Sequence, residues 1–220
     1  MEPDFLIVKR FQNLHNILTP CEAYGQVLMR SDSEIIVYCH DDVTIHESGW
    51  LRRVLAPFDR PDCIAVGLGG ANSLGRPNLY KRPYQIVDMS RGGYRSNQTD
   101  WEVHGTHEIG ESRVAVLDAF VMAVRRDFLL GIGGWPTAHL THHCLDLWLA
   151  CEAARAGKEI WQVGAGCTHH GGGSSTKPAY RGAAWLQGGT LEEDHRQPHR
   201  WLYDNYRDVL PIREKEEVVL

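Results

Sequence analysis

The chain has 220 residues, of which 43% are hydrophobic and 23% are charged, and its formal net charge is −5. These proportions exclude disordered and fibrous classes, and the acidic balance disfavours a whole-molecule attraction to nucleic acid. No apolar run approaches the roughly 18–20 residues of a membrane helix, and residues 1–6 lack the basic and apolar regions of a signal peptide. We therefore expect a single cytoplasmic domain over residues 1–220.

The first half of the chain predicts a strand, a helix and a second strand. Residues 34–39 are a short apolar run rich in β-branched residues, which is typical of a buried strand. A helical period of apolar residues follows from Glu47 and is ended by two prolines, and residues 63–68 predict the next strand. This βαβ order implies a parallel sheet. Residues 5–8 are the only strand candidate before residue 34.

The second half begins with a long connection over about 69–113. It holds few apolar residues and many Gly, Asn, Arg and Tyr, and long loops are usually lids or binding segments. Regular structure returns at 114–124, which is strand in part, and a short helix begins at Arg125 and is closed by glycines. The remaining expected elements are a helix over about 144–155, a strand at 159–163, a loop at 169–175 and a helical tail over about 195–220 with a frayed end at 213–217.

The cysteines and histidines bear on whether the chain holds a metal. The six cysteines form no C-x-x-C pair, so a cysteine-only zinc site is disfavoured and buried free thiols are expected. The twelve histidines are unusual because several of them cluster in sequence. The clustered histidines are His139, His142, His143, His169 and His170.

Paired carboxylates directly follow the first predicted strand of the βαβ unit. Ligands bind beyond the carboxyl ends of strands in parallel sheets, and Asp41 and Asp42 stand at such an end. Two carboxylates can hold a hard divalent cation, which would neutralise a diphosphate. The alternative is an ordinary turn with solvated carboxylates.

Two further positions could carry chemistry. Asp146 stands in the first turn of a predicted helix, where the helix dipole alone stabilises a carboxylate, so a catalytic role requires a cleft near Asp42. His169 and His170 precede three glycines, which allow close approach of a ligand, and imidazole is a common metal ligand. Because adjacent side chains point to different sides, we expect at most one of the two histidines to share an ion with Asp42.

The long connection also interleaves basic residues with tyrosines. Such a surface can hold phosphates and stack on bases or sugars, although a solvated loop is the simpler interpretation. The basic residues concerned are Arg76, Lys81, Arg82, Arg91 and Arg95.

Taken in order, these pieces resemble a family-2-like glycosyltransferase of the GT-A fold, from about residue 20 to 175. Residues 32–43 are similar to the family's strand that ends in a D-x-D-type motif, in the branch with HDD or HQD there. Asp146 stands eleven residues before Gly157, which is the family's spacing between the catalytic base and a glycine. Three further matches are residues 117–126 to "DG-f-a-RR", residues 128–135 to "f…iGGfD" and residues 168–174 to "H-H-g-G-S".

The resemblance implies an α/β, Rossmann-type sandwich with a mixed, mainly parallel central sheet. It also implies metal-dependent, inverting transfer of a sugar from a nucleotide-sugar donor to an acceptor hydroxyl. Asp42 would hold Mn²⁺ or Mg²⁺ on the donor diphosphate, His170 or His169 would complete the metal site, and Asp146 would be the base. The implied donor or acceptor contacts are Asp41, His40, Asp118, Trp135 and His143.

The sequence departs from the family pattern in several places, two of which concern the donor site. His40 occupies the first D-x-D position, and the short N-terminal region leaves the acid that reads the nucleotide base unplaced. The acceptor is open among a saccharide, a protein, a small molecule and a hydroxylated DNA base. The basic loop favours the DNA base, whereas the net charge opposes it. Two other functions stay open, namely a zinc hydrolase using His142, His143, His169 and His170, and a binding module for nucleotide-sugars without transfer.

Overall fold

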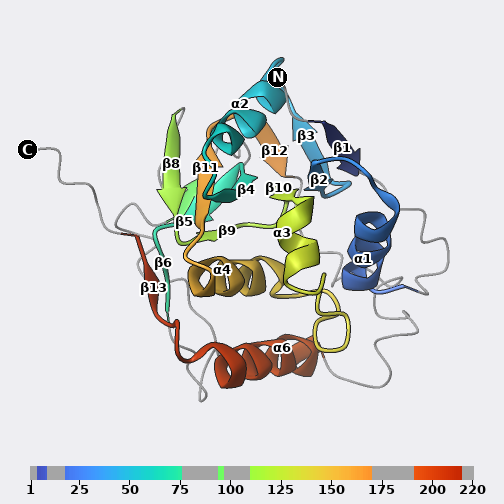
Figure 1. The fold of residues 1–220 in the computed structure, drawn as a ribbon, viewed down its shortest axis with the longest axis vertical. Coiled ribbons are helices and arrows are strands. Elements are labelled where there is room, and N and C mark those ends of the chain that lie inside the picture. Colours follow the sequence, from blue (N-terminus) through green and yellow to red (C-terminus); the bar gives the residue numbers. More distant parts are fainter. Residues whose placement is uncertain (1–3, 9–17, 76–93, 97–109, 170–190, 215–220) are drawn as a thin grey trace, which may run out of the picture.

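The computed structural model describes residues 4–8, 18–75, 94–96, 110–169 and 191–214 (Figure 1). Its centre is a six-stranded sheet in the order β1-β2-β10-β4-β11-β8. These strands are β1 (Phe5–Val8), β2 (Ile35–Cys39), β10 (Val121–Arg125), β4 (Cys63–Gly67), β11 (Glu159–Val163) and β8 (Glu111–Val114).

The sheet is mixed, as the sequence predicts. Strands β1, β2, β4 and β11 run in one direction, whereas β10 and β8 run in the other. The predicted βαβ unit is present, but its two strands are not neighbours, because β10 inserts between β2 and β4 and is antiparallel to both. The apolar run at 114–124 is therefore interrupted by a turn at 118–120 before β10 begins.

The central strands are apolar along their whole length because both faces of the sheet are covered. Every residue of β2 and β4 is buried. Helix α2 (Trp50–Leu55) and a 3₁₀ turn (Ala56–Asp59) pack on one face, and helix α4 (Leu145–Arg155) lies on the other (Figure 1). Two apolar clusters result, one on each face of the sheet.

Helix α1 (Pro20–Arg30) was not predicted from the sequence, although its start carries a readable signal. The Thr19 side chain accepts a hydrogen bond from the backbone N–H of Glu22, and the Glu22 carboxylate accepts one from the N–H of Thr19. This is a capping box, with Pro20 at the first helical position. Cys21, Tyr24, Val27 and Leu28 also follow a helical period and pack in or against the main apolar cluster.

The prediction of a long connection over 69–113 is wrong at both ends of that range, where the structure has strands. Strands β5 (Gly69–Ala71) and β6 (Ser73–Leu74) open it, and β8 closes it at Glu111. A Cβ on Gly70 would lie 2.7 Å from the carbonyl oxygen of Val116, so only glycine permits this strand pairing. Glycine carries no hydrophobic pattern, which explains why periodicity did not reveal β5.

Four other short strands belong to the smaller sheets. They are β3 (Val43–Ile45), β7 (Tyr94–Ser96), β9 (Val116–Leu117) and β12 (Cys167–His169). The predicted loop at 169–175 is therefore wrong at its first residue, because His169 ends β12 and pairs with Val43 across an antiparallel ladder.

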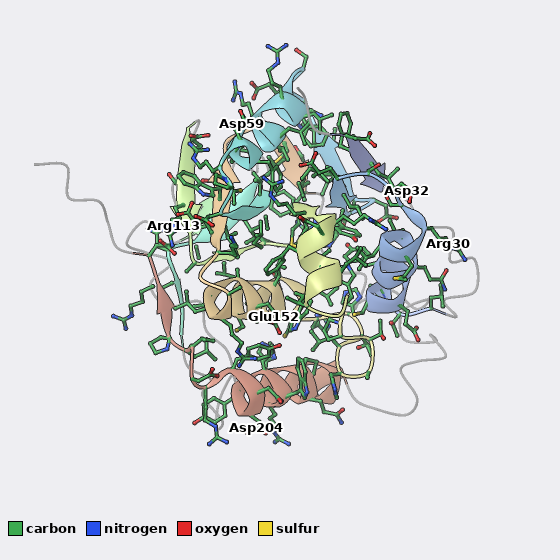
Figure 2. All side chains as sticks on the ribbon, in the orientation of Figure 1. Arg30, Asp32, Asp59, Arg113, Glu152 and Asp204 are labelled. Carbon is green, nitrogen blue, oxygen red and sulfur yellow. The ribbon has the colours of Figure 1, made fainter. Side chains whose placement is uncertain are left out.

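The C-terminal tail contains the predicted helix, α6 (Leu191–Tyr206), followed by β13 (Ile212–Arg213). Helix α6 lies beside α4 (Figure 1), and Figure 2 labels Glu152 of α4, whose carboxylate accepts a hydrogen bond from the Tyr206 hydroxyl. The prediction of a frayed end is wrong for residues 213–214. Strand β13 pairs with β6, and Glu214 forms a 3.0 Å ion pair with Arg113. Residues 215–217 lie outside the described residues.

The predicted state of the thiols is confirmed. All six cysteines are buried and none forms a disulfide. Burial raises the pKa of Cys21, Cys63, Cys151 and Cys167 to about 12. In the part of the chain that the structure describes, no helix combines the length and apolar character needed to cross a membrane.

Candidate functional site

Two histidines and an aspartate come together where β2 ends. Each of His40, Asp42 and His169 offers one ligand atom, and these three atoms lie within 4.8 Å of one another. His169 Nε2 is 3.3 Å from Asp42 Oδ1, and His40 Nδ1 is 3.9 Å from the same oxygen. We call these three residues the His–Asp–His cluster. All three are half-buried, so a ligand can reach them.

The cluster follows from the local strand order. Strand β2 ends at Cys39 and β3 starts at Val43, so His40 and Asp42 lie in the short turn between the two strands. Strand β12 then pairs antiparallel with β3 and places His169 opposite Val43. Residues about 125 positions apart in the chain thereby meet at the carboxyl end of β2, where α/β proteins usually bind ligands.

The chemistry of the donor set fits a divalent transition metal. A neutral imidazole is a metal ligand, and burial lowers the pKa of His40, with the Asp118 carboxylate opposing that shift and His169 adding to it. Two imidazoles and one carboxylate suit Mn²⁺ or Zn²⁺ better than Mg²⁺, which prefers oxygen ligands. Within the described residues, this is the one group of three such side chains close enough to share an ion.

The turn at 118–120 lies between the cluster and Asp146. The Asp118 carboxylate influences both His40 and Asp146 electrostatically. The backbone N–H of Ala119 donates to the Asp146 carboxylate. The carbonyl oxygen of Phe120 accepts a 2.8 Å hydrogen bond from the N–H of His40. The turn therefore contacts both parts of the site.

Asp146 lies in the first turn of α4, as predicted. Burial, followed by the Asp118 carboxylate, raises the pKa of Asp146 to about 6 against hydrogen bonds that favour the charged form. One of these is donated by the backbone N–H of Leu147 at 2.8 Å. A carboxyl with this pKa is ionised at neutral pH and still accepts a proton readily, which is what a general base requires.

Trp135 lies in the core and is 5% exposed. Its indole N–H donates to the Tyr38 hydroxyl at 3.2 Å, and its ring lies 5.3 Å from that of Trp148 and 5.7 Å from that of Tyr24. Trp135 thus braces the interior beside the site and offers little surface for stacking on a sugar.

The structure places the other predicted contacts at varying distances from the cluster. Asp41 is exposed and adjoins Asp42, whereas His143 is half-buried with its ring 4.5 Å from that of His142. Arg95 belongs to β7, where its backbone pairs with Gly70. Five predicted residues lie outside the described part of the chain, namely His170, Arg76, Lys81, Arg82 and Arg91.

The described residues do not form the histidine site that was considered for a zinc hydrolase. His169 joins His40 and Asp42, and no described group of three ligands includes His142 or His143. Sequence reasoning treated His40 as a substituted D-x-D position and did not count it as a ligand. The available signal was its spacing, two residues before Asp42 in the same turn.

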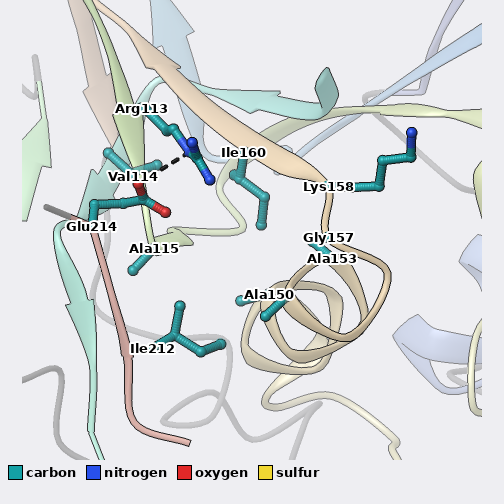
Figure 3. A pocket seen from close by; sticks show the side chains of 11 residues that line it. Arg113, Val114, Ala115, Ala150, Ala153, Gly157, Lys158, Ile160, Ile212 and Glu214 are labelled. Carbon is teal, nitrogen blue, oxygen red and sulfur yellow. Dashed lines mark ion pairs between the residues drawn. The ribbon is translucent and has the colours of Figure 1, made fainter. Parts of the chain in front are cut away.

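Two cavities lie away from the cluster. One, of about 230 Å³, lies between α4, β8 and β13 and is lined largely by small apolar residues, with the Arg113–Glu214 ion pair at its edge (Figure 3). The other, of about 430 Å³, lies between α1 and the segment at 133–137. Neither cavity is lined by a residue of the His–Asp–His cluster.

Comparison with known proteins bears on the family. Residues 9–177 match a family model described as "Glycosyltransferase like family". No curated protein matches the sequence. Among solved structures, GalNAc-T7 with UDP, GalNAc and Mn²⁺ is similar at a TM-score of 0.44 and 11% identity, over 66% of this chain and 29% of that chain. A197 from STIV is similar at a TM-score of 0.39 and 16% identity, over 74% of this chain and 69% of that chain.

The chain therefore spans under a third of the length of the GalNAc-T7 chain. The family match, by contrast, covers well over half of the present sequence and includes the His–Asp–His cluster and Asp146. This chain belongs to the glycosyltransferase-like family.

Proposed function

We propose that the chain is a metal-dependent, inverting glycosyltransferase that moves a sugar from a nucleotide-sugar donor to an acceptor hydroxyl. The observation that carries this proposal is the His–Asp–His cluster at the end of β2, joined through the 118–120 turn to Asp146. A metal site and a base held by one turn are the two parts that such a transfer needs.

His40, Asp42 and His169 would hold the divalent metal. When bound, Mn²⁺ or a similar ion acts as a Lewis acid and offsets the negative charge that develops on the departing nucleotide diphosphate. The cluster brings only one carboxylate, so these residues would neutralise only part of the charge of a divalent cation held there. Asp41 is exposed beside the cluster and stands where it can contact the donor.

Asp146 would accept the proton of the acceptor hydroxyl as the oxygen attacks the anomeric carbon. The new carbon–oxygen bond forms on the face opposite the breaking bond to the diphosphate, so the configuration inverts. The raised pKa of about 6 matches this task, because a base is most effective when its pKa lies near the working pH. Asp118 supports the raised value by its negative charge.

The experiment that tests the proposal pairs donor binding with turnover. Thermal shifts with a panel of nucleotide-sugars, with and without Mn²⁺, identify a donor, since a ligand of the folded state raises the melting temperature. Nucleotide release from that donor in the presence of candidate acceptors then measures transfer. Asp42→Asn should lose the metal-dependent shift, and Asp146→Asn should keep the shift but lose at least about a hundredfold in transfer, the scale of general-base catalysis.

A matched control is Asp32→Asn, which changes an exposed aspartate that precedes β2 at its opposite end. This variant should bind and turn over the donor like the wild type. Metal-independent donor binding that survives Asp42→Asn would contradict the metal role, and full transfer by Asp146→Asn would contradict the base role. Donor binding without any nucleotide release would identify a binding module.

A further inference from the structure

Phe120 contacts two members of the His–Asp–His cluster, His169 through its ring and His40 through its backbone. Phe120 is 0% exposed and lies in the 118–120 turn just before β10. Its ring stacks on the imidazole of His169, with the centroids 5.2 Å apart and the planes only 17° apart. Its carbonyl oxygen accepts the N–H of His40 at 2.8 Å.

These two contacts act on different elements of the fold. His40 follows β2, whereas His169 ends β12, and these strands belong to separate sheets. Strand pairing places Val121 opposite Cys39, so Phe120 and His40 are held in register at the strand ends. The ring of Phe120 then reaches across to the last residue of β12. Phe120 thus contacts both histidines, His40 at the end of β2 through the backbone and His169 at the end of β12 through the ring.

We propose that Phe120 is a positioning residue that holds the imidazole of His169 so that its Nε2 faces Asp42. The inference rests on the proposed function, because it assigns Phe120 to the metal site. A buried, nearly parallel ring restricts rotation of the imidazole about its Cβ–Cγ bond, which the 3.3 Å contact with the Asp42 carboxylate alone would restrict less. Groups that orient metal ligands without touching the metal typically change metal affinity by about 10–100-fold when they are removed.

The test measures Mn²⁺ binding to the full chain by the loss of the electron paramagnetic resonance signal of free Mn²⁺. Phe120→Leu keeps an apolar side chain but removes the ring, and it should weaken Mn²⁺ binding by about tenfold or more. Phe58→Leu is the matched control. Phe58 is a buried phenylalanine of the same apolar cluster and has no contact with the His–Asp–His cluster among the described interactions. It should leave Mn²⁺ affinity within about twofold of the wild type.

A second measurement does not need the metal. Long-range ¹H–¹⁵N NMR of the metal-free protein reports which ring nitrogen of His169 carries the proton. In the wild type we expect the Nε2–H form, because Nε2 lies 3.3 Å from the Asp42 carboxylate. Phe120→Leu should give a mixture of the two tautomers, whereas Phe58→Leu should not. A general loss of stability would affect both variants, so this readout separates positioning from packing.

The outcomes distinguish the two proposals. If the wild type binds no Mn²⁺, the metal role in the proposed function fails, and the tautomer of His169 still decides the role of Phe120. Mn²⁺ affinity and a tautomer that are unchanged in Phe120→Leu would overturn the inference. Should Phe120→Leu not fold, Phe120→Met retains more side-chain volume and is judged by the same two measurements.

Discussion

Burial and a neighbouring charge set the basicity of the Asp146 carboxyl, which is the proposed base. The side chain is held by the backbone N–H groups of Leu147 and Ala119, which favour its charged form. Burial and the Asp118 carboxylate favour the neutral form and prevail, so the pKa rises to about 6. The hydrogen bonds fix the carboxyl in place, and the opposing effects set its basicity. Position and proton affinity are thus controlled by different contacts.

The pH dependence of transfer follows from this balance. A base works only when ionised, so the transfer rate should rise tenfold per pH unit below about 6 and then level off. In Asp118→Asn the neighbouring negative charge is gone, so the acidic limb should move to lower pH. The measurement is nucleotide release at saturating donor between pH 4.5 and 8. Asp59→Asn, an exposed change, serves as the control. If the acidic limb of the pH–rate profile stays at the same pH in Asp118→Asn, the Asp118 charge does not raise the pKa of the proposed base.

Residue types and spacing predicted part of the site. The pairing of Asp42 with one of two adjacent histidines was inferred from a strand end and from side-chain alternation, and the structure brings His169 to Asp42. The place of His40 in the cluster was indicated only by its spacing, two residues before Asp42. The contacts of Phe120 with His40 and His169 could not be inferred, because they depend on a ladder between β3 and β12 and on a turn before β10, and both bring together residues that are distant in sequence.

At the scale of elements, the strands and helices with strong apolar patterns were predicted closely. Strands β2, β4 and β11 and helix α4 agree with the expectation within two residues. Short glycine-rich strands were missed because they have no apolar period to read, whereas α1 was missed although its capping box and the spacing of its apolar residues both indicate a helix. The antiparallel insertion of β10 was also missed, since periodicity carries no information on strand order.

A substitution at Gly70 tests whether strand β5 depends on the close approach of its backbone to that of β9. A Cβ at this position would meet the Val116 carbonyl oxygen at 2.7 Å and the Val114 side chain at 3.1 Å. Gly70→Ala should therefore lower the free energy of unfolding by about 1–3 kcal/mol, the usual cost of overpacking. Chemical denaturation monitored by circular dichroism measures the change.

The control for this prediction is Gly131→Ala. Nothing lies within 4 Å of a Cβ at Gly131, which ends helix α3 (Arg126–Gly131) in an ordinary helical conformation. Alanine is the better helix former, so stability should stay the same or rise slightly. An equal loss in the free energy of unfolding in the two variants would show that the close approach at Gly70 does not contribute to stability.

At the scale of the whole molecule, the C-terminal segment is part of the main core although it follows the residues that match the family model. Leu202, Tyr206 and Leu210 are buried in the same apolar cluster as helix α4. Arg155 of α4 forms a 3.0 Å ion pair with Asp208, and His139 stacks on Trp201 with the ring centroids 4.6 Å apart. Since α4 carries Asp146, the tail supports the helix that holds the proposed base.

This arrangement predicts that damage in the tail destabilises the entire fold. Leu202 is 0% exposed, and Leu202→Ala should lower the free energy of unfolding by about 2–5 kcal/mol, as for other large-to-small core changes. Unfolding should remain a single transition by both tryptophan fluorescence and far-ultraviolet circular dichroism, because one core is shared. Asp204→Ala, an exposed change two residues away, should have little effect. Two separate transitions in the wild type, with only the first shifted by Leu202→Ala, would show instead that the tail folds apart from the sheet and leaves Asp146 unsupported by it.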